Sequence, residues 1–254
     1  MLFRFLLALA AALSCVPVVP AQLIAYFPFA GNAVDATNHG FSANTVNATY
    51  TASGGYTGAG AQGGAYLFNG TSNYLEMAGL NINPSVYPRL TIGAWVRASS
   101  NTPIRQIVSQ DNGGFDRSLG IDDRGSTTGW SAGIGSGGAL GGESVATDTW
   151  TFVAVVYDQP AQTATLYVDD RAYTATNAVL GTGWNLTRVG MNPSSGQYFA
   201  GTIDELFFYN GALTASQLAD VRLHGVSSIP EPSTFAFLGL GLGLVALAVR
   251  RRRE

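Results

Sequence analysis

Lysine is absent from the 254-residue chain, and cysteine occurs once, at Cys15. All 13 basic residues are therefore arginines, and they stand against 16 aspartates and glutamates. An acidic chain without a basic patch binds the phosphate backbone poorly, which argues against a nucleic-acid partner. The two histidines, His39 and His224, have no metal ligand, serine or cysteine at a recognisable spacing. Neither a zinc site nor a catalytic triad is therefore indicated.

Residues 1–21 are typical of an export signal. Arg4 supplies a positive charge, and the apolar run 5–13 is too short to span a bilayer comfortably. Compact residues at Val19 and Ala21 predict cleavage after Ala21 and export through the Sec pathway. The mature chain would then contain no cysteine and no disulfide. Lipid attachment at Cys15 is an alternative interpretation.

Residues 229–254 contain three features in a fixed order. A Pro-Glu-Pro motif is followed by the apolar run 235–249 and then by four arginines. The motif is Pro230, Glu231 and Pro232, and the cluster is Arg250, Arg251, Arg252 and Arg253. As a helix the apolar run would be roughly 22 Å long, against about 30 Å for a bilayer core. The run is thus a marginal membrane helix, with its arginines expected on the cytoplasmic side.

This order of features resembles the PEP-CTERM sorting signal of Gram-negative bacteria. The resemblance implies an exosortase-type partner that cuts near the Pro-Glu-Pro motif. It also implies an inner-membrane anchor before processing, and a final place at the cell surface or in the extracellular matrix. An ordinary tail anchor is the alternative, and whether the tail is removed stays open.

The remaining 22–228 segment is long enough for one sizeable core. Its eight arginines and fourteen acids give a formal charge of 8 − 14 = −6. Short β-branched and aromatic runs recur between Gly, Asn and Asp clusters, which predicts an all-β domain. Strands are expected near 23–29, 65–68, 74–77, 90–97, 104–109, 118–121, 150–157, 164–168, 171–175, 186–190 and 202–209. Weaker strands are expected near 130–134 and 144–146.

One short helix is predicted at the C-terminal end of the domain. Thr214 and Gln217 have the spacing of a capping box, in which each side chain bonds the backbone of the other. Leu213, Leu218 and Val221 would then face a sheet. The glycine-rich stretches 54–64 and 135–142 are predicted to be mobile loops, because ordering glycine costs much entropy.

Several segments line up with one family in order and spacing. They are AYFPFAGNAVD (25–35), AYLFNG (65–70), NYLE (73–76), LTIGAWV (90–96), WTFVAVVYD (150–158), LYV (166–168) and GTIDELFFYNGAL (201–213). Together they resemble a LamG-like jelly roll of the concanavalin A-like lectin/glucanase superfamily. The resemblance implies a two-sheet antiparallel sandwich with one short C-terminal helix, followed here by the membrane helix. It does not fix a function.

Glucanases of that superfamily use two carboxylates that flank the scissile bond. Their usual Glu-x-Asp-x-x-Glu strand has no counterpart in this chain, and the three glutamates of 22–228 lie far apart. Asp204 and Glu205 are adjacent, so on a regular strand they would point to opposite faces and could not act as a pair. We therefore expect no enzymatic activity.

A structural calcium ion is the one cofactor that the resemblance implies. In many LamG-like domains the N-terminal loop and the last strand meet at calcium, and Asp35 and Asp204 match those positions. Calcium prefers hard oxygen ligands, which carboxylates and loop carbonyls supply. The alternative is that Asp35 caps a turn and Asp204 makes a hydrogen bond within the sheet.

A sugar-binding site would use exposed aromatic rings, which stack on sugars, together with polar side chains for the hydroxyl groups. Trp95 and Trp150 lie in strand segments and are expected in the core. The aromatic residues in or beside loops are the candidates for ligand binding: Trp130, Tyr198, Tyr56 and Phe115, with Trp184 as a further one.

The sequence thus predicts an exported, non-enzymatic surface or matrix protein that binds a glycan, such as exopolysaccharide, or another surface protein. One alternative is a purely structural, self-associating domain without a ligand. The other is a cryptic glycoside hydrolase, which would require two inward carboxylates at roughly 5–9 Å.

Overall fold

The structure is a computed structural model that describes residues 21–124, 128–135 and 138–229. Cys15, the Pro-Glu-Pro motif, the apolar run 235–249 and the terminal arginines lie outside these ranges. Within them, no helix is both long and apolar enough to cross a membrane.

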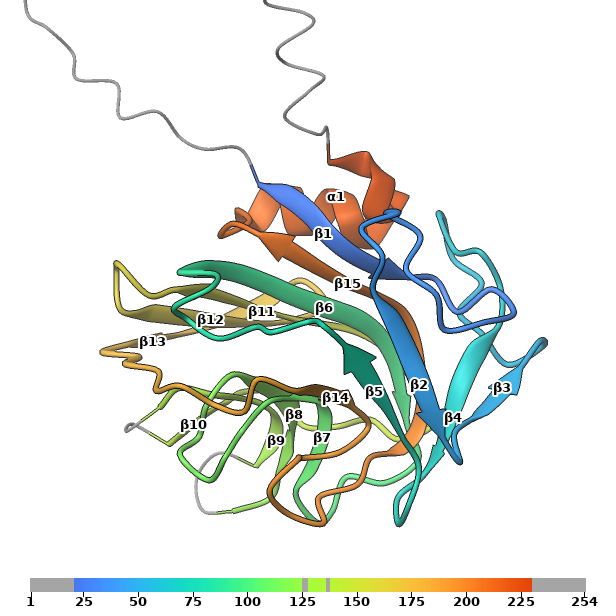
Figure 1. Cartoon of the computed structure of the whole chain (residues 1–254), viewed down its shortest axis with the longest axis horizontal. Helices are drawn as coiled ribbons and strands as arrows, with labels where there is room; N and C mark the ends of the chain where they lie inside the picture. Colours follow the sequence, from blue (N-terminus) through green and yellow to red (C-terminus); the bar gives the residue numbers. More distant parts are fainter. Residues whose placement is uncertain (1–20, 125–127, 136–137, 230–254) are drawn as a thin grey trace, which may run out of the picture.

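Two antiparallel β-sheets face each other (Figure 1). Sheet A contains β1 (Gln22–Phe27), β3 (Thr49–Thr51), β4 (Ala65–Asn69), β6 (Arg89–Ala98), β11 (Trp150–Asp158), β12 (Thr163–Val168), β13 (Arg171–Thr176) and β15 (Ala200–Asn210). Sheet B contains β2 (Ser42–Val46), β5 (Tyr74–Ala78), β7 (Arg105–Ser109), β8 (Ser118–Asp122), β9 (Gly129–Gly133), β10 (Ala139–Gly141) and β14 (Thr187–Val189).

The long strands occupy the middle of sheet A. Its order is β13-β12-β11-β6-β15-β4-β3, with β1 also paired to β15, and the order of sheet B is β10-β9-β8-β7-β14-β5-β2. β11 and β15 are buried along almost their whole length because both of their faces are covered. This double burial explains the nearly continuous apolar sequence of β11, while β15 also buries Thr202, Asp204 and Glu205.

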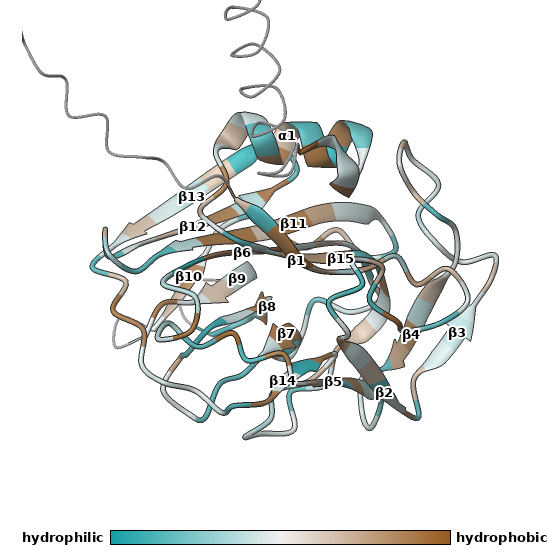
Figure 2. Cartoon of the chain, turned by 45° about the horizontal axis from the view of Figure 1, so that its top comes forward, coloured by the Kyte–Doolittle hydropathy of each residue, from teal (hydrophilic) through white to brown (hydrophobic). Residues whose placement is uncertain are grey.

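The main core fills the space between the sheets, and apolar stretches appear brown in the strands of both (Figure 2). β8 and β9 show how the pleat divides their residues. Leu119, Ile121, Trp130 and Ala132 belong to the core, while the residues between them face outward. The outward face of β8 and β9 is therefore built from the serine, glycine and aspartate residues that alternate with these core positions.

Helix α1 (Ala215–His224) covers the outer face of sheet A (Figure 1). The predicted capping box is confirmed, because Thr214 accepts from the Gln217 backbone N–H and Gln217 accepts from that of Thr214. Leu218 and Val221 then pack in a second apolar cluster against that face. The short 3₁₀ helix η1 (Val226–Ser228) follows, and Tyr209 Oη donates to the Val226 carbonyl oxygen at 2.7 Å.

The predicted two-sheet sandwich with one short helix is confirmed. All eleven expected strands are present, and the weaker segment 130–134 corresponds to β9. The segment 144–146 was predicted as a strand wrongly, since no strand lies there. Three strands were missed. β2 and β3 are polar edge strands, and β10 lies inside the glycine-rich stretch that predicted only a loop.

Both ends of the described chain lie at the α1 end of the molecule (Figure 1). Gln22 pairs with Asn210 at the end of β15, and Gln22 and Ser227 line the same surface hollow. β7 to β10 lie on the opposite side of the sandwich (Figure 1).

Candidate functional site

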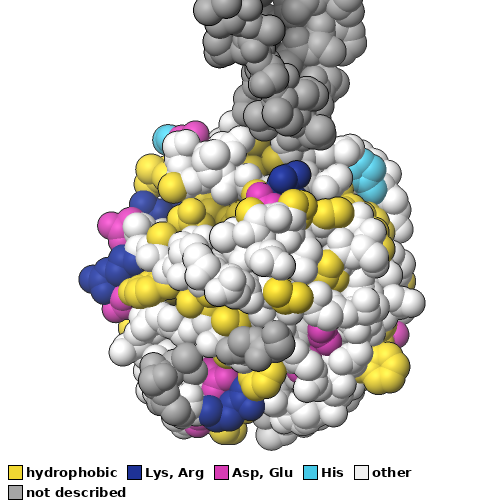
Figure 3. Space-filling model, turned by 90° about the vertical axis from the view of Figure 1, so that its left-hand side faces the viewer, with side chains coloured by type: hydrophobic (Ala, Val, Ile, Leu, Met, Phe, Trp, Pro, Cys, Tyr) yellow, Lys and Arg dark blue, Asp and Glu magenta, His cyan; other side chains and the backbone are white. Residues whose placement is uncertain are grey.

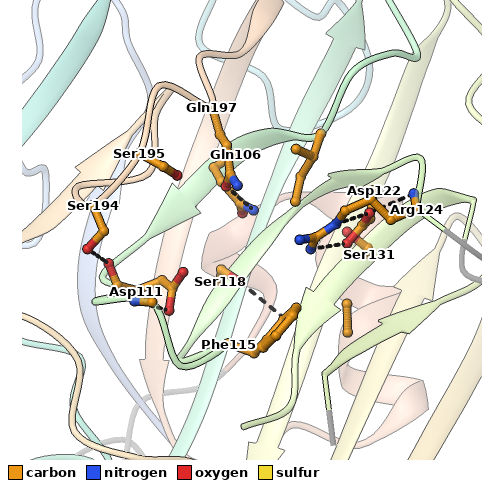
Figure 4. Close-up of a pocket in the computed structure, with 14 residues that line it drawn as sticks. Gln106, Asp111, Phe115, Ser118, Asp122, Arg124, Ser131, Ser194, Ser195 and Gln197 are labelled. Atoms are coloured by element: carbon orange, nitrogen blue, oxygen red, sulfur yellow. Dashed lines mark hydrogen bonds and ion pairs between the residues drawn. The ribbon is translucent and has the colours of Figure 1, made fainter. Parts of the chain in front are cut away.

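A groove of about 210 Å³ lies on the outer face of sheet B, over β7, β8 and β9 (Figure 4). Its floor consists of the residues that alternate with the core positions. Ser118 and Asp122 come from β8, and Ser131 and Gly133 come from β9. The apolar alternation that builds the core thus also places a polar strip on the opposite face.

Two glycines of β8 and β9 allow neighbouring backbone to approach closely. A Cβ atom at Gly120 would lie 2.2 Å from the Arg105 carbonyl oxygen, and one at Gly133 would lie 2.2 Å from the Asp116 carbonyl oxygen. Both contacts are with backbone, so no side chain fits at these positions without a shift of the strands. Of the two, Gly133 lines the groove, and with Ser118 and Ser131 it makes the floor one of small residues.

Gln106 lies on the floor with one polar atom left without a partner. Its side chain is 7% exposed, and its Nε2 donates to Gln197 Oε1 at 3.4 Å. Its Oε1 is buried and accepts no hydrogen bond. A buried polar atom without a partner costs about 1–3 kcal/mol, which a ligand hydroxyl that donates to it would recover.

One wall of the groove contains Arg124, which is paired with Asp122 of the floor, and the aromatic ring of Phe115. Asp122 accepts from Arg124 Nε at 2.9 Å and from Nη2 at 2.7 Å, so both of its oxygens bind the guanidinium. The Arg124 guanidinium carbon lies 5.2 Å from the centre of the Phe115 ring. Figure 3 shows dark blue and magenta side chains next to each other on one face of the molecule.

The Phe115 ring is held by a loop with a fixed shape. Its backbone φ of 56° is in the left-handed region, which is unusual for an aromatic residue. Asp111 Oδ1 accepts from the backbone N–H groups of Gly113 and Asp116, and the Phe115 carbonyl accepts from Gly135 N–H at 2.8 Å. These bonds offset the strain and orient the half-exposed ring toward the groove (Figure 4).

The opposite wall comes from the 192–197 loop. Asn192 Nδ2 donates to Asp111 Oδ2 and to Gln197 Oε1, both at 2.9 Å. Ser194 Oγ donates to the Asp111 carbonyl oxygen at 2.8 Å. The two walls are therefore connected through Asp111, and the groove is preorganised.

Asp204 and Glu205 form a different cluster, on the outer face of sheet A. The expectation that they point to opposite faces is wrong, because a register irregularity follows Asp204 and Glu205 has a φ of 51°. Both carboxylates hold the 54–64 loop. Asp204 Oδ2 accepts from Tyr56 N–H and Glu205 Oε1 accepts from Gln62 N–H, each at 2.8 Å. The loop contains no strand, as predicted, but it is attached to the sheet at two points.

Burial in this cluster changes the acidity of its members. It raises the pKa of Asp204 to about 7, and the nearby Glu205 charge adds to the rise. It also raises the pKa of Glu205 and that of Tyr26, whose hydroxyl donates to Glu205 Oε2. The cluster is covered by loop and helix, so it is a clamp rather than an open site.

Asp35 caps a turn, as the alternative to the calcium interpretation predicts. Its Oδ1 accepts from the N–H groups of Tyr26 at 3.0 Å and Thr37 at 2.9 Å, which caps the N-terminal loop. Asp204 Oδ1 also accepts from the Glu205 N–H at 2.8 Å. Within the described ranges, no group of three or more His, Cys, Asp or Glu side chains could hold a metal ion. This donor set does not fit a metal centre built from side chains, and calcium stays a prediction.

The four predicted aromatic residues lie in four different places. Phe115 lines the groove, and Tyr198 lies next to it, where its carbonyl oxygen accepts from Arg105 Nη1 at 2.8 Å. Tyr56 is on the outer face of sheet A, with its ring stacked 3.7 Å from that of Trp95. Trp130 was predicted as a ligand-binding residue wrongly. It is 1% exposed and packs in the core, because β9 turns it inward.

The polar residues of the groove were missed from the sequence. The signal was present in β8 and β9, where Ser, Gly and Asp alternate with apolar residues. Small polar residues alternate in this way on any solvated strand, so the pattern did not stand out. Their convergence with Gln106 and the 192–197 loop depends on strand pairing that the sequence does not state.

The two facing antiparallel sheets define a concanavalin A-like jelly roll. Residues 69–219 match the model of the concanavalin A-like lectin/glucanases superfamily, and the chain belongs to this superfamily. Residues 228–253 match the PEP-CTERM protein-sorting motif, as predicted. The chain is therefore a sorted, surface-directed protein, and the motif implies processing by an exosortase. No curated protein sequence shows a significant match.

Solved structures with the same fold include carbohydrate-related and toxin domains. Domain 4 of AbnA, a GH43 extracellular arabinanase from Geobacillus stearothermophilus in complex with arabinotriose, is 23% identical, with a TM-score of 0.56. The match covers 80% of this chain and 98% of that one. The binding domain of Paraclostridial Mosquitocidal Protein 1 is 14% identical, with a TM-score of 0.57 and 79% and 51% coverage. The binding domain of botulinum neurotoxin DC in complex with SialylT is 11% identical, with a TM-score of 0.56. The match covers 79% of this chain and 50% of that one. At these identities the likeness shows the fold alone.

Proposed function

We propose that the domain is a non-enzymatic glycan-binding module of a surface or matrix protein. The observation that carries this proposal is the groove on sheet B. It combines an aromatic ring at Phe115, a floor of serine and glycine, and the buried Gln106 Oε1 without a partner. Sugars present an apolar face for stacking and hydroxyl groups that donate and accept, which suits this combination.

Binding without cleavage is favoured by the partners of the two carboxylates that line the groove. Both oxygens of Asp122 are bound by Arg124. Asp111 accepts from two backbone N–H groups and from Asn192. A glycosidase needs one carboxyl group that protonates the leaving oxygen and a second that attacks or activates water. Carboxylates with these hydrogen bonds serve as fixed acceptors instead.

The distant fold relatives are consistent with this proposal in one respect. The arabinanase domain was solved with arabinotriose, and one of the toxin binding domains was solved with SialylT. The sorting motif indicates a surface-directed protein, and an exopolysaccharide of the producing cell is the ligand that we expect there.

The test is retention of the full chain, kept in mild detergent, on immobilised polysaccharides. The panel contains arabinan, β-glucan, galactan, polygalacturonate and the exopolysaccharide of the producing cell. Binding to one class should fall about tenfold in Phe115→Ala and in Gln106→Ala, the loss typical of one central contact residue. Val86→Ala, an exposed apolar residue outside the groove, is the matched control.

Each alternative function predicts a different result. A self-associating structural domain would bind none of these polymers and would show a mass that rises with protein concentration. A glycoside hydrolase would release reducing ends from a bound polymer. Either result, with both groove variants correctly folded, would refute the proposal.

A further inference from the structure

Trp184 is an exposed aromatic residue whose polar atoms all have partners. Its side chain is 52% exposed, yet its Nε1 donates to Ser194 Oγ at 2.8 Å. Its backbone N–H donates to the Gln110 carbonyl oxygen at 2.8 Å, and its carbonyl oxygen accepts from Asn83. The indole is therefore fixed in place, and what it offers to solvent is ring surface.

The bond to Ser194 connects Trp184 to the groove. Ser194 lines the groove, and its hydroxyl donates in turn to the Asp111 carbonyl oxygen. Trp184 thus stands behind the 192–197 wall, while Phe115 stands on the other wall. The rings of Phe115 and Trp184 therefore lie on either side of the floor, whose own residues are small or polar. Rigid aromatic side chains lose little entropy on binding and are frequent anchors.

The charges around the groove are mostly negative. Among the described residues that line it, Asp111 and Asp122 are the acids and Arg124 is the cation, which is already bound to Asp122. Asp123 follows directly in the chain and interacts with Arg105 of β7, so these two charges offset each other, while the 22–228 segment carries a formal charge of −6. A carboxylate, sulfate or phosphate on a polymer would meet repulsion here, and no lysine could compensate.

We propose that the groove binds an uncharged linear polysaccharide that crosses from Phe115 to Trp184, with Trp184 as a second stacking site. This inference rests on the proposed function, because it specifies the ligand class of the same groove. The central sugar lies on the serine and glycine floor and donates a hydroxyl hydrogen bond to Gln106 Oε1. A sugar further along the chain stacks on the indole of Trp184.

The length dependence of binding tests the second stacking site. The full chain is titrated with a disaccharide and a hexasaccharide of the polymer that the panel identifies. Trp184→Ala should weaken the hexasaccharide about tenfold and leave the disaccharide unchanged. Phe115→Ala should weaken both. Trp184→Phe, which keeps a ring, should recover most of the loss, and Leu223→Ala on α1 is an exposed apolar control.

The charge of the ligand is tested with matched polymers. Each neutral polymer is compared with its derivative in which the primary alcohols are oxidised to carboxylates. The neutral form should bind at least about tenfold more tightly, and the difference should shrink as salt screens the repulsion. Equal or tighter binding of the oxidised form would overturn the inference on charge.

A failure of the second stacking site and a failure of the proposed function give different results. If Trp184→Ala weakens both lengths equally or neither, the second site is wrong, while an effect of Phe115→Ala still supports the groove. If no neutral or oxidised polymer binds, the proposed function itself fails, and this inference fails with it.

Discussion

The outer faces of the two sheets differ in what covers them. Sheet A is covered by α1 and by aromatic side chains, including Phe152, Phe207 and Tyr209, which form a second apolar cluster. Among the described residues, no helix lies on the outer face of sheet B, and β8 and β9 present serine, glycine and aspartate there. The same sandwich therefore has one face covered by further apolar packing and one face that contains the proposed ligand groove.

The acidic residues of the two faces differ in the same way. Asp204 and Glu205 on sheet A accept backbone N–H groups of a covering loop, and burial raises the pKa of both. Asp122 on sheet B is bound by Arg124 at the groove wall. Acidic side chains alone therefore do not mark the functional face. The two clusters differ in the partners of their carboxylates, which are backbone N–H groups of a covering loop on sheet A and the Arg124 guanidinium on sheet B.

Two neighbouring residues on β9 give the largest expected contrast. Trp130→Ala opens a cavity in the core and should lower the free energy of unfolding by about 3–5 kcal/mol. Ser131→Ala, one residue later and on the groove face, removes only a hydroxyl group, so it should change that free energy by no more than about 1 kcal/mol and weaken glycan binding. Urea unfolding of residues 22–229 and glycan titration measure the two effects. Equal destabilisation by both variants would contradict the assigned faces.

The carboxylate cluster should make stability depend on pH by a few kcal/mol. Asp204 has an ordinary pKa of 3.8 and a folded pKa of about 7, so the folded state binds more protons between these values. The free energy of unfolding should therefore fall as pH rises from about 4 to about 7. Asp204→Asn should flatten that slope, measured by urea unfolding at several pH values. Asp220→Asn on α1 should leave the slope intact.

The predicted calcium ion would need backbone carbonyl or water ligands beside Asp35 and Asp204, because the described side chains do not form a metal centre by themselves. Calcium bound in this way, at a hundredfold excess over its Kd, should stabilise the domain by about 3 kcal/mol relative to chelator. Asp35→Asn and Asp204→Asn should each remove that shift in a melting experiment, and Asp170→Asn should not. A melting temperature that is the same with calcium and with chelator would contradict the calcium prediction and would leave both carboxylates with hydrogen-bond partners alone, which are backbone N–H groups and, for Asp35, the Thr37 hydroxyl.

The capping box should give the smallest effect. Thr214→Ala removes the acceptor of the Gln217 N–H and should cost about 1 kcal/mol of unfolding free energy. Thr214→Ser keeps the hydroxyl and should cost much less. Glycan binding should be unchanged in both variants, because α1 lies on the face opposite the groove. A loss of binding in Thr214→Ala at equal folding would show that the two faces are coupled.

The parts of the fold that depend on local sequence could be predicted. β11 has a long apolar run, and Thr214 and Gln217 have a spacing that specifies a helix start, so both were found. β2 has the sequence Ser-Ala-Asn-Thr-Val and lies at an edge, where little apolar burial is required. No local signal distinguishes such a strand from a loop.

The candidate site was less predictable because it depends on long-range pairing. Phe115 was found as an aromatic residue in a loop. Gln106 and Ser131 meet only through the pairing of β7, β8 and β9, and the 192–197 loop reaches them from far along the chain. The irregularity at Asp204 is a backbone feature, and the sequence pattern of alternation predicted the opposite arrangement.

The position of the chain ends has a consequence for copies arrayed on a surface. Both ends of the described chain lie at the α1 end, and β7, β8 and β9, over which the groove lies, are on the other side of the sandwich (Figure 1). A tether at either end therefore leaves the groove facing the medium. Many tethered copies would hold one long polymer at several points, and multivalent attachment raises the overall avidity far above that of a single domain. A weak individual site would then be sufficient to cross-link the polymer into a coat.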